Sequence, residues 1–161
     1  MTTAAPALTS VGSTTRRRRS VVALLALLAL ALAAAACMPA EERTFFDRTN
    51  ALRATEHVSQ LAEQDILTAK AEAWAQHMAA TGRLEHSVLT ADLGDLAWTK
   101  LGENVGMSGP TSDTLLTIHN MFVASAEHRA NLVNSQYTHM GVGVATDSAG
   151  RVWVSEVFAQ L

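Results

Sequence analysis

Three short polar motifs contain the residues of this sequence that could do chemistry. They are LEHS with His86, LGENVG with Glu103 and SAEHRAN with His128. Imidazole and carboxylate side chains act as general acids and bases near neutral pH and as ligands for divalent metals. The sequence has no HExxH, G-x-S-x-G, phosphate-loop or CxxC motif. These dispersed residues are therefore the candidates for a reaction or binding site.

Each candidate taken alone also has a structural interpretation, which is the simpler one. His86 could be a solvated loop residue, and His128 could fasten a short helix to the sheet. Glu103 lies between glycines, where its carboxylate could cap neighbouring backbone amides. The other four histidines are interpreted as ordinary surface or half-buried residues: His57, His77, His119 and His139.

His128 lies where a helical pattern gives way to an alternating one. In SAEHRANLVNSQYTHMGVGV, Ser125 can cap a short helix by accepting a hydrogen bond from the backbone N–H of Glu127 or His128. A residue at a helix N-terminus is disfavoured as a cation, which would keep the imidazole of His128 neutral and able to bind a ligand. Arg129 and Asn131 are expected to face outward or to brace the following loop.

The elements that must position these residues are helices followed by a hairpin. Helical periodicity covers residues 44–58 and 65–82, where Gly82 provides a stop, and a third helix begins near Asp113 with Thr111 or Ser112 as its cap. After Asn134 the pattern alternates, and the turn TDSAGR joins two strands. This order predicts an α+β fold.

The first part of the chain has the layout of an export signal. Arg16–Arg19 precede an apolar run, residues 21–36, which is shorter than the roughly 20 residues of a spanning helix. The run ends in AAAC, which resembles a bacterial lipoprotein box with Cys37 as the lipidated residue. An uncleaved short anchor and a twin-arginine signal are the alternatives. We expect a signal at residues 1–36, Cys37 with a tether to residue 43, and a domain at residues 44–161.

The cysteine and charge content favours a lipidated exported protein and argues against nucleic-acid binding. With Cys37 as its only cysteine, an exported chain cannot form an internal disulfide, and lipidation explains a lone cysteine at a processing site. Four of the twelve Lys and Arg residues and none of the fifteen Asp and Glu residues precede Cys37, so the remaining chain has a net charge of −7. Such an acidic body is a poor nucleic-acid binder.

The motifs, taken in order, resemble the CAP superfamily of cysteine-rich secretory, antigen 5 and pathogenesis-related 1 proteins, also called the SCP domain. The likeness is closest to its bacterial extracellular branch. It runs from FFDRTNALRA through WAQHMAATGRLEHS, LGENVGM and SAEHRANLVNSQYTHMGVGV to VWVSEVFA. The resemblance implies an α-β-α sandwich with a three-stranded antiparallel sheet and a shallow central cavity.

The same resemblance implies roles for the candidate residues. His86 and His128 match the two cavity histidines, which bind a divalent metal, commonly zinc, in several relatives, and Glu103 matches the glutamate of the GEN motif. Two imidazoles, a carboxylate and water would satisfy an open zinc site. Ser125 stands where eukaryotic relatives have a second cavity glutamate. One carboxylate cannot run a scheme that needs a paired general acid and general base.

Two classes of function follow. The first is a monomeric binding module, anchored by lipid on the outer face of the bacterial cell membrane or fully secreted, that takes a small apolar ligand or an envelope partner. The alternative is a metal-dependent hydrolase or protease that uses His86, Glu103 and His128, with Ser125 as a nucleophile in one version. The absence of an established nucleophile motif favours binding over enzymatic activity.

Overall fold

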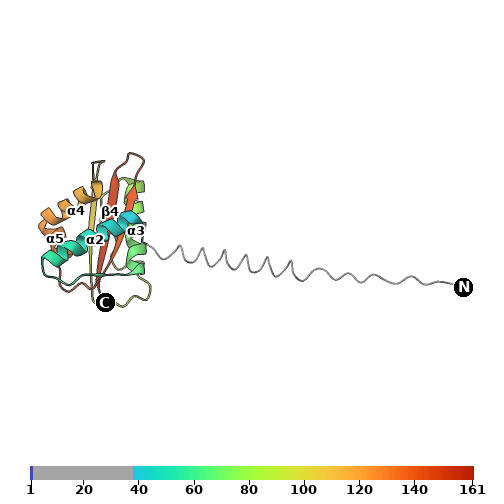
Figure 1. Ribbon diagram of the computed structural model, residues 1–161, viewed down its shortest axis with the longest axis horizontal. Coiled ribbons are helices and arrows are strands. Elements are labelled where there is room, and N and C mark those ends of the chain that lie inside the picture. The colour runs from blue at the N-terminus through green and yellow to red at the C-terminus, as the bar shows by residue number, and fades with distance from the viewer. Residues whose placement is uncertain (2–37) are drawn as a thin grey trace. The chain divides into compact units, whose positions relative to one another are not determined.

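The computed structural model describes Met1 and residues 38–161 (Figure 1). Residues 2–36 of the predicted export signal and Cys37, the predicted lipidation site, lie outside the described residues. Residues 38–161 form one compact unit that contains every hydrophobic cluster found in the described part of the chain. This unit therefore has a complete core of its own. None of the described helices is long and apolar enough to span a membrane.

The unit has an α+β architecture, as the sequence predicted. In chain order its elements are α2 (Ala40–Thr55), β1 (Ala62–Glu63), α3 (Asp65–Thr81), β2 (Lys100–Ser108), α4 (Thr114–Ala124), α5 (Ala126–Leu132), β3 (His139–Thr146) and β4 (Val152–Gln160).

The sheet has the strand order β1-β3-β4-β2. Strands β3, β4 and β2 are antiparallel, which is the three-stranded core that the resemblance implied. The two-residue β1 adds a fourth, parallel strand beside the start of β3. Strand β2 is consequently an edge strand, and this edge is where the candidate residues gather.

Helix α3 packs against one face of the sheet at very short range. Gly141 and Gly143 make this approach possible, because a Cβ at either position would overlap the backbone of α3 at Leu67–Thr68 or Ala71–Glu72. The two glycines thus give β3 a face without side chains, which is the contact surface for α3. Helix α3 ends at Gly82, which adopts the left-handed conformation with φ of 67°.

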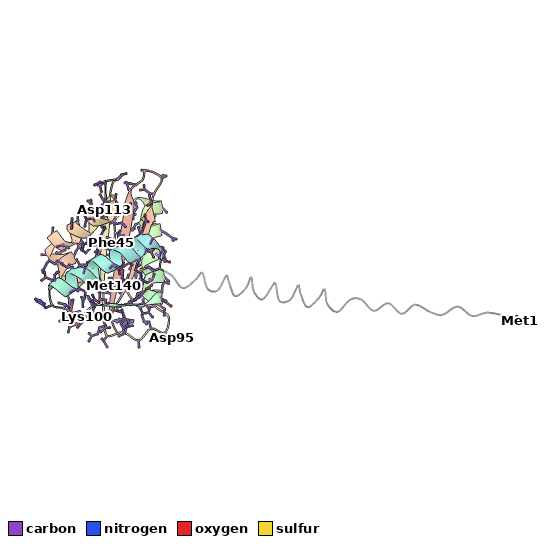
Figure 2. The ribbon with its side chains drawn as sticks, viewed as in Figure 1. Met1, Phe45, Asp95, Lys100, Asp113 and Met140 are labelled. Carbon is purple, nitrogen blue, oxygen red and sulfur yellow. The ribbon has the colours of Figure 1, made fainter. Side chains whose placement is uncertain are left out.

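The other face of the sheet is covered by α2, α4 and α5, which Figure 1 shows together on one side of the strands. The main hydrophobic cluster lies between these helices and the sheet. It includes Phe45 of α2 and Met140 of β3, both labelled in Figure 2 and both fully buried.

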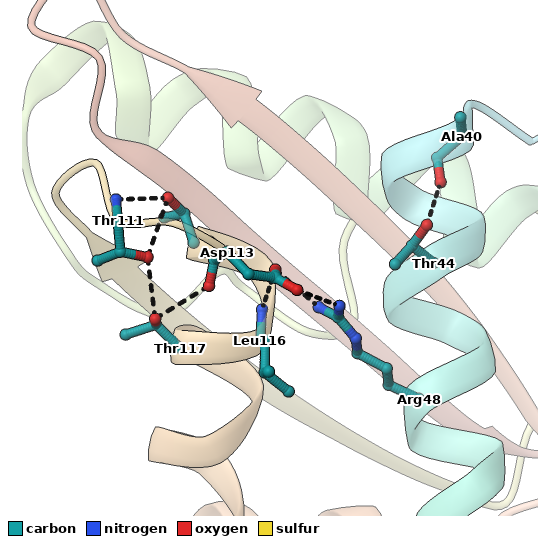
Figure 3. Close-up of polar contacts among 8 residues, drawn as sticks. Ala40, Thr44, Arg48, Thr111, Asp113, Leu116 and Thr117 are labelled. Atoms are coloured by element: carbon teal, nitrogen blue, oxygen red, sulfur yellow. Dashed lines mark hydrogen bonds and ion pairs between the residues drawn. The ribbon is translucent and has the colours of Figure 1, made fainter.

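Two helix starts differ from the sequence prediction. Asp113 itself caps α4, rather than Thr111 or Ser112, since its carboxylate accepts from the amide of Leu116 at 2.9 Å and also pairs with Arg48 of α2 at 2.7 Å (Figure 3). Helix α2 begins at Ala40, so residues 40–43 belong to the helix and not to a tether. Met38 already packs against the main cluster, and no free spacer separates it from the domain.

Candidate functional site

The candidate site lies along the edge strand β2, where segments from both faces of the sheet meet. Glu103 and Asn104 are neighbours on this strand and point to opposite faces, as the period of a strand requires. Glu103 contacts the loop that follows α3 and carries His86, whereas Asn104 contacts α5, which carries His128.

Glu103 holds the His86 segment with one of its two carboxylate oxygens. Its Oε2 lies 2.8 Å from Nδ1 of His86 and accepts from the backbone amide of Ser87 at 2.9 Å. Its Oε1 is buried and has no hydrogen-bond partner among the described residues. The side chain of Glu103 is 1% exposed and that of His86 is 60% exposed. Glu103 therefore binds the His86 segment instead of capping its own neighbours.

The loop that carries His86 has no regular structure from Gly82 to Thr99 and is fastened by two side chains of α3. Trp74 donates its indole N–H to the carbonyl of Glu85 at 2.8 Å. Lys70, one turn earlier and buried, donates to the carbonyls of Val88 and Ala91 at 2.9 and 3.0 Å. These bonds fix the chain on both sides of His86.

His128 lies in the first turn of α5, capped as the sequence predicted. The hydroxyl of Ser125 accepts from the amide of His128 at 3.4 Å, and the imidazole lies 4.9 Å from the ring of Phe122, measured between centroids. Burial lowers the pKa of His128, the charge of His86 lowers it further, and Glu127 opposes the shift. The predicted neutral imidazole is thus favoured chiefly by burial.

A buried polar network behind the site escaped the sequence analysis. Asn104 donates to the carbonyl of His128 at 3.2 Å and to Glu156 at 3.1 Å, and it accepts from Asn131 at 3.0 Å. Asn131 also donates to the carbonyl of Glu103 at 3.2 Å, so it braces β2 rather than facing outward. Glu156 could have been noticed as a single carboxylate in the apolar strand VWVSEVFA.

The histidines supply two nitrogen donors for a metal. No group of three or more His, Cys, Asp or Glu side chains in the described part of the chain is arranged to hold a metal ion. Because Glu103 binds Nδ1 of His86, Nε2 of that ring remains available, as in metal sites where a carboxylate orients a ligating histidine. Two imidazoles are suitable ligands for a divalent cation, and Glu103 is placed to orient the ring of His86.

Comparison with known proteins identifies the domain type. Residues 46–158 match the model of the family CAP, the cysteine-rich secretory protein family. No curated protein matches the chain.

Solved structures share the fold. An extracellular protein of Bacillus anthracis containing an SCP domain has a TM-score of 0.62 and 24% identity, over 75% of this chain and 40% of its own. An outer surface protein of Borrelia burgdorferi has a TM-score of 0.65 and 14% identity, over 74% of this chain and 92% of its own. NaASP2 with Zn²⁺ has a TM-score of 0.54 and 17% identity, over 77% and 82%. At these identities the likeness is one of fold, and the chain spans about two fifths of the Bacillus protein.

Proposed function

The chain belongs to the cysteine-rich secretory protein (CAP) family, and on that premise we propose that it is an exported binding module. Its binding site comprises His86, Glu103, Ser125 and His128. The ligand is a small apolar molecule or a component of the cell envelope, which contacts the site directly or through a bound divalent cation.

The observation that carries this proposal is that only one of the two carboxylate oxygens of Glu103 is hydrogen-bonded. One oxygen accepts two hydrogen bonds, while the other is buried beside His86 with no partner in the described part of the chain. A buried acceptor left unsatisfied costs about 1–3 kcal/mol, so a protein rarely leaves one unpaired without a use for it. A donor group or a cation brought by a ligand would satisfy this oxygen.

Separately from this oxygen, a divalent cation such as zinc is the simplest candidate for a group bound by the two histidines. His86 and His128 would hold it through ring nitrogens, and Glu103 would orient His86. With two protein ligands, such a cation would keep coordination positions open and would supply a Lewis-acidic point of attachment for a ligand. The Zn²⁺ in the structure of NaASP2 supports the proposal only through a shared fold.

Metal stoichiometry on residues 38–161 tests the proposal. We expect close to one Zn²⁺ per chain in the wild type and loss of that zinc in the His86→Ala/His128→Ala double variant. His57→Asn is the matched control, because His57 has a φ of 58° that asparagine tolerates and takes no part in the site. Equal zinc content in all three proteins would refute a metal at this site. A binding site without a metal would then be supported if apolar molecules bound to the wild type and not to the double variant.

Export with a lipid on Cys37 is the proposed location, and release into the medium is its alternative. The extracellular Bacillus protein and the Borrelia outer surface protein support export. Mass spectrometry of the mature N-terminus would show the lipid on Cys37, and Cys37→Ser would move the protein from the membrane fraction to the medium. An unmodified Cys37 in a protein found in the medium would favour the secreted form.

The contact between Glu103 and His86 also supports a second candidate function, that of a hydrolase. A carboxylate on Nδ1 of an imidazole stabilises the tautomer and orientation that a general base needs. Ser125 contributes less to this alternative, since its hydroxyl binds the backbone amide of His128. Hydrolysis of a peptide or ester library that disappears in His86→Ala would support an enzyme, and identical rates in the variant would exclude this mechanism.

A further inference from the structure

The geometry points to Glu156 as a positioning residue that sets the orientation of His128 by way of Asn104. The effect of Glu156 on ligand affinity rests on the proposed function of the site. Its effect on the position of α5 does not. Glu156 lies in the middle of β4 and is separated from His128 by the side chain of Asn104.

The first step of the argument is the burial of Glu156. The residue is fully buried, and its carboxylate accepts from the hydroxyl of Thr49 at 2.7 Å and from the amide of Asn104 at 3.1 Å. A carboxyl group removed from water costs free energy unless hydrogen bonds replace its hydration, and here both bonds go to side chains of other segments. A carboxylate at this position is therefore better explained by what it orients than by stability.

The second step is the orientation of the Asn104 side chain. Oε2 of Glu156 accepts from Nδ2 of Asn104 at 3.1 Å, so the amide of Asn104 turns its Nδ2 group and not its Oδ1 toward β4. The second N–H of the same group then reaches the carbonyl of His128 at 3.2 Å. If the amide were reversed, Oδ1 would face that carbonyl, and two acceptors would repel each other.

The third step joins the amide to the site. With Nδ2 directed at Glu156, the Oδ1 of Asn104 is free to accept from Asn131 at 3.0 Å. The first turn of α5 is thereby tied to β2 through the His128 carbonyl and the Asn131 side chain. Glu103 lies on the same strand, one residue before Asn104, so this link fixes His128 relative to Glu103.

Two substitutions separate positioning from charge. Glu156→Leu removes the acceptor, whereas Glu156→Gln removes the same charge but keeps an oxygen that can accept from Asn104. We expect His128 in the Leu variant to become more exposed, with its pKa moving up toward the ordinary value, and to stay close to the wild type in the Gln variant. Zinc affinity should fall about 10-fold in the Leu variant, which is typical for loss of an outer-shell partner.

Histidine ring signals in NMR spectra of residues 38–161 give the readout without any ligand. If Glu156→Leu does not fold, Asn104→Ala is the second test variant, and we expect the same change in His128. Thr49→Val should leave His128 unchanged, because it removes only the hydrogen bond between Thr49 and Glu156. Equal His128 pKa values in the Leu and Gln variants would overturn the positioning role. Absence of zinc binding in the wild type would instead refute the proposed metal, while the ring signals would still decide the role of Glu156.

Discussion

Glu103 is the residue of the site that combines burial with a contact to an exposed side chain. Its carboxylate is almost inaccessible, yet it contacts an imidazole that is largely exposed. The carboxylate, held by strand β2, thus fixes the position of a histidine on an irregular loop. The other oxygen of the same group is buried and has no hydrogen-bond partner among the described residues.

The substitution Glu103→Gln tests this division of roles. The single amide oxygen can take the place of Oε2 and accept from both the His86 ring and the Ser87 amide, but the NH₂ group would then lie at the buried position of Oε1 as a donor without an acceptor. We expect a loss of about 1–3 kcal/mol in the free energy of unfolding, measured with urea. Glu63→Gln, which breaks only a surface ion pair with Arg43, should change it by less than about 1 kcal/mol. Equal losses would contradict a special role for Glu103.

Two buried carboxyl groups should make stability depend on pH. Burial raises the pKa of Glu156 to about 7, above its ordinary value of 4.5, and burial likewise raises the pKa of Glu42 to about 7. A group with a raised pKa in the folded state binds its proton more tightly there. Its contribution to stability is fully present below pH 4.5 and is lost as the pH rises toward 7.

The lowered pKa values of His119 and His128 act in the opposite direction below pH 6.5, so a single pH profile mixes the two effects. The difference in unfolding free energy between the wild type and Glu156→Gln isolates the carboxyl group. We expect this difference to shift in favour of the wild type as the pH falls from 7 to 4.5. A constant difference over that range would show that Glu156 titrates with the same pKa in the folded and unfolded states.

At the scale of elements, the loop that follows α3 is the least regular part of the site and depends on the helix before it. In Lys70→Met, the carbonyls of Val88 and Ala91 lose their donor while the apolar stem remains. We expect faster amide hydrogen exchange in residues 83–99 and a loss of about 1–3 kcal/mol in stability. Lys100→Met, at the exposed start of β2, is the control. Unchanged exchange in the loop would mean that Trp74 and Glu103 hold it alone.

The contact between α3 and β3 sets the position of that helix. Gly143→Ala would place a methyl group inside the backbone of Ala71–Glu72, and we expect a loss of about 1–3 kcal/mol or more, as in other overpacked cores. Gly109→Ala has nothing within 4 Å of the added methyl and should leave the stability unchanged. Similar thermal unfolding of the two variants would contradict the close approach.

Local patterns predicted much of this architecture. The helical stripe and Gly82 defined α3, and the alternation after Asn134 indicated the hairpin, because both depend on neighbours in the chain. The predicted helix start at Thr44 and the predicted cap at Thr111 or Ser112 were wrong, since α2 begins at Ala40 and Asp113 caps α4, because helix ends depend on side-chain geometry. The network of Thr49, Asn104 and Glu156 joins three distant segments, and no local period reveals it.

Residues 38–161 form a sandwich in which the edge strand β2 contacts polar groups on both faces of the sheet. The resemblance selected His86, Glu103 and His128. The structure brings Glu103 into contact with His86 and links Asn104, the next residue on β2, to the backbone of His128. Ser125 serves α5 as its cap. The buried partners of these residues lie on α2, α3 and β4, so every layer of the fold contributes to the position of the site.

A crystal of residues 38–161 soaked in Zn²⁺, with anomalous scattering recorded at the zinc edge, tests the central claim most directly. The account predicts one peak within bonding distance of Nε2 of His86 and of the ring of His128, with Glu103 still on Nδ1 of His86. A peak at other residues, or histidine rings that stay unligated at saturating zinc, would contradict a metal-supported binding site at this edge of the sheet.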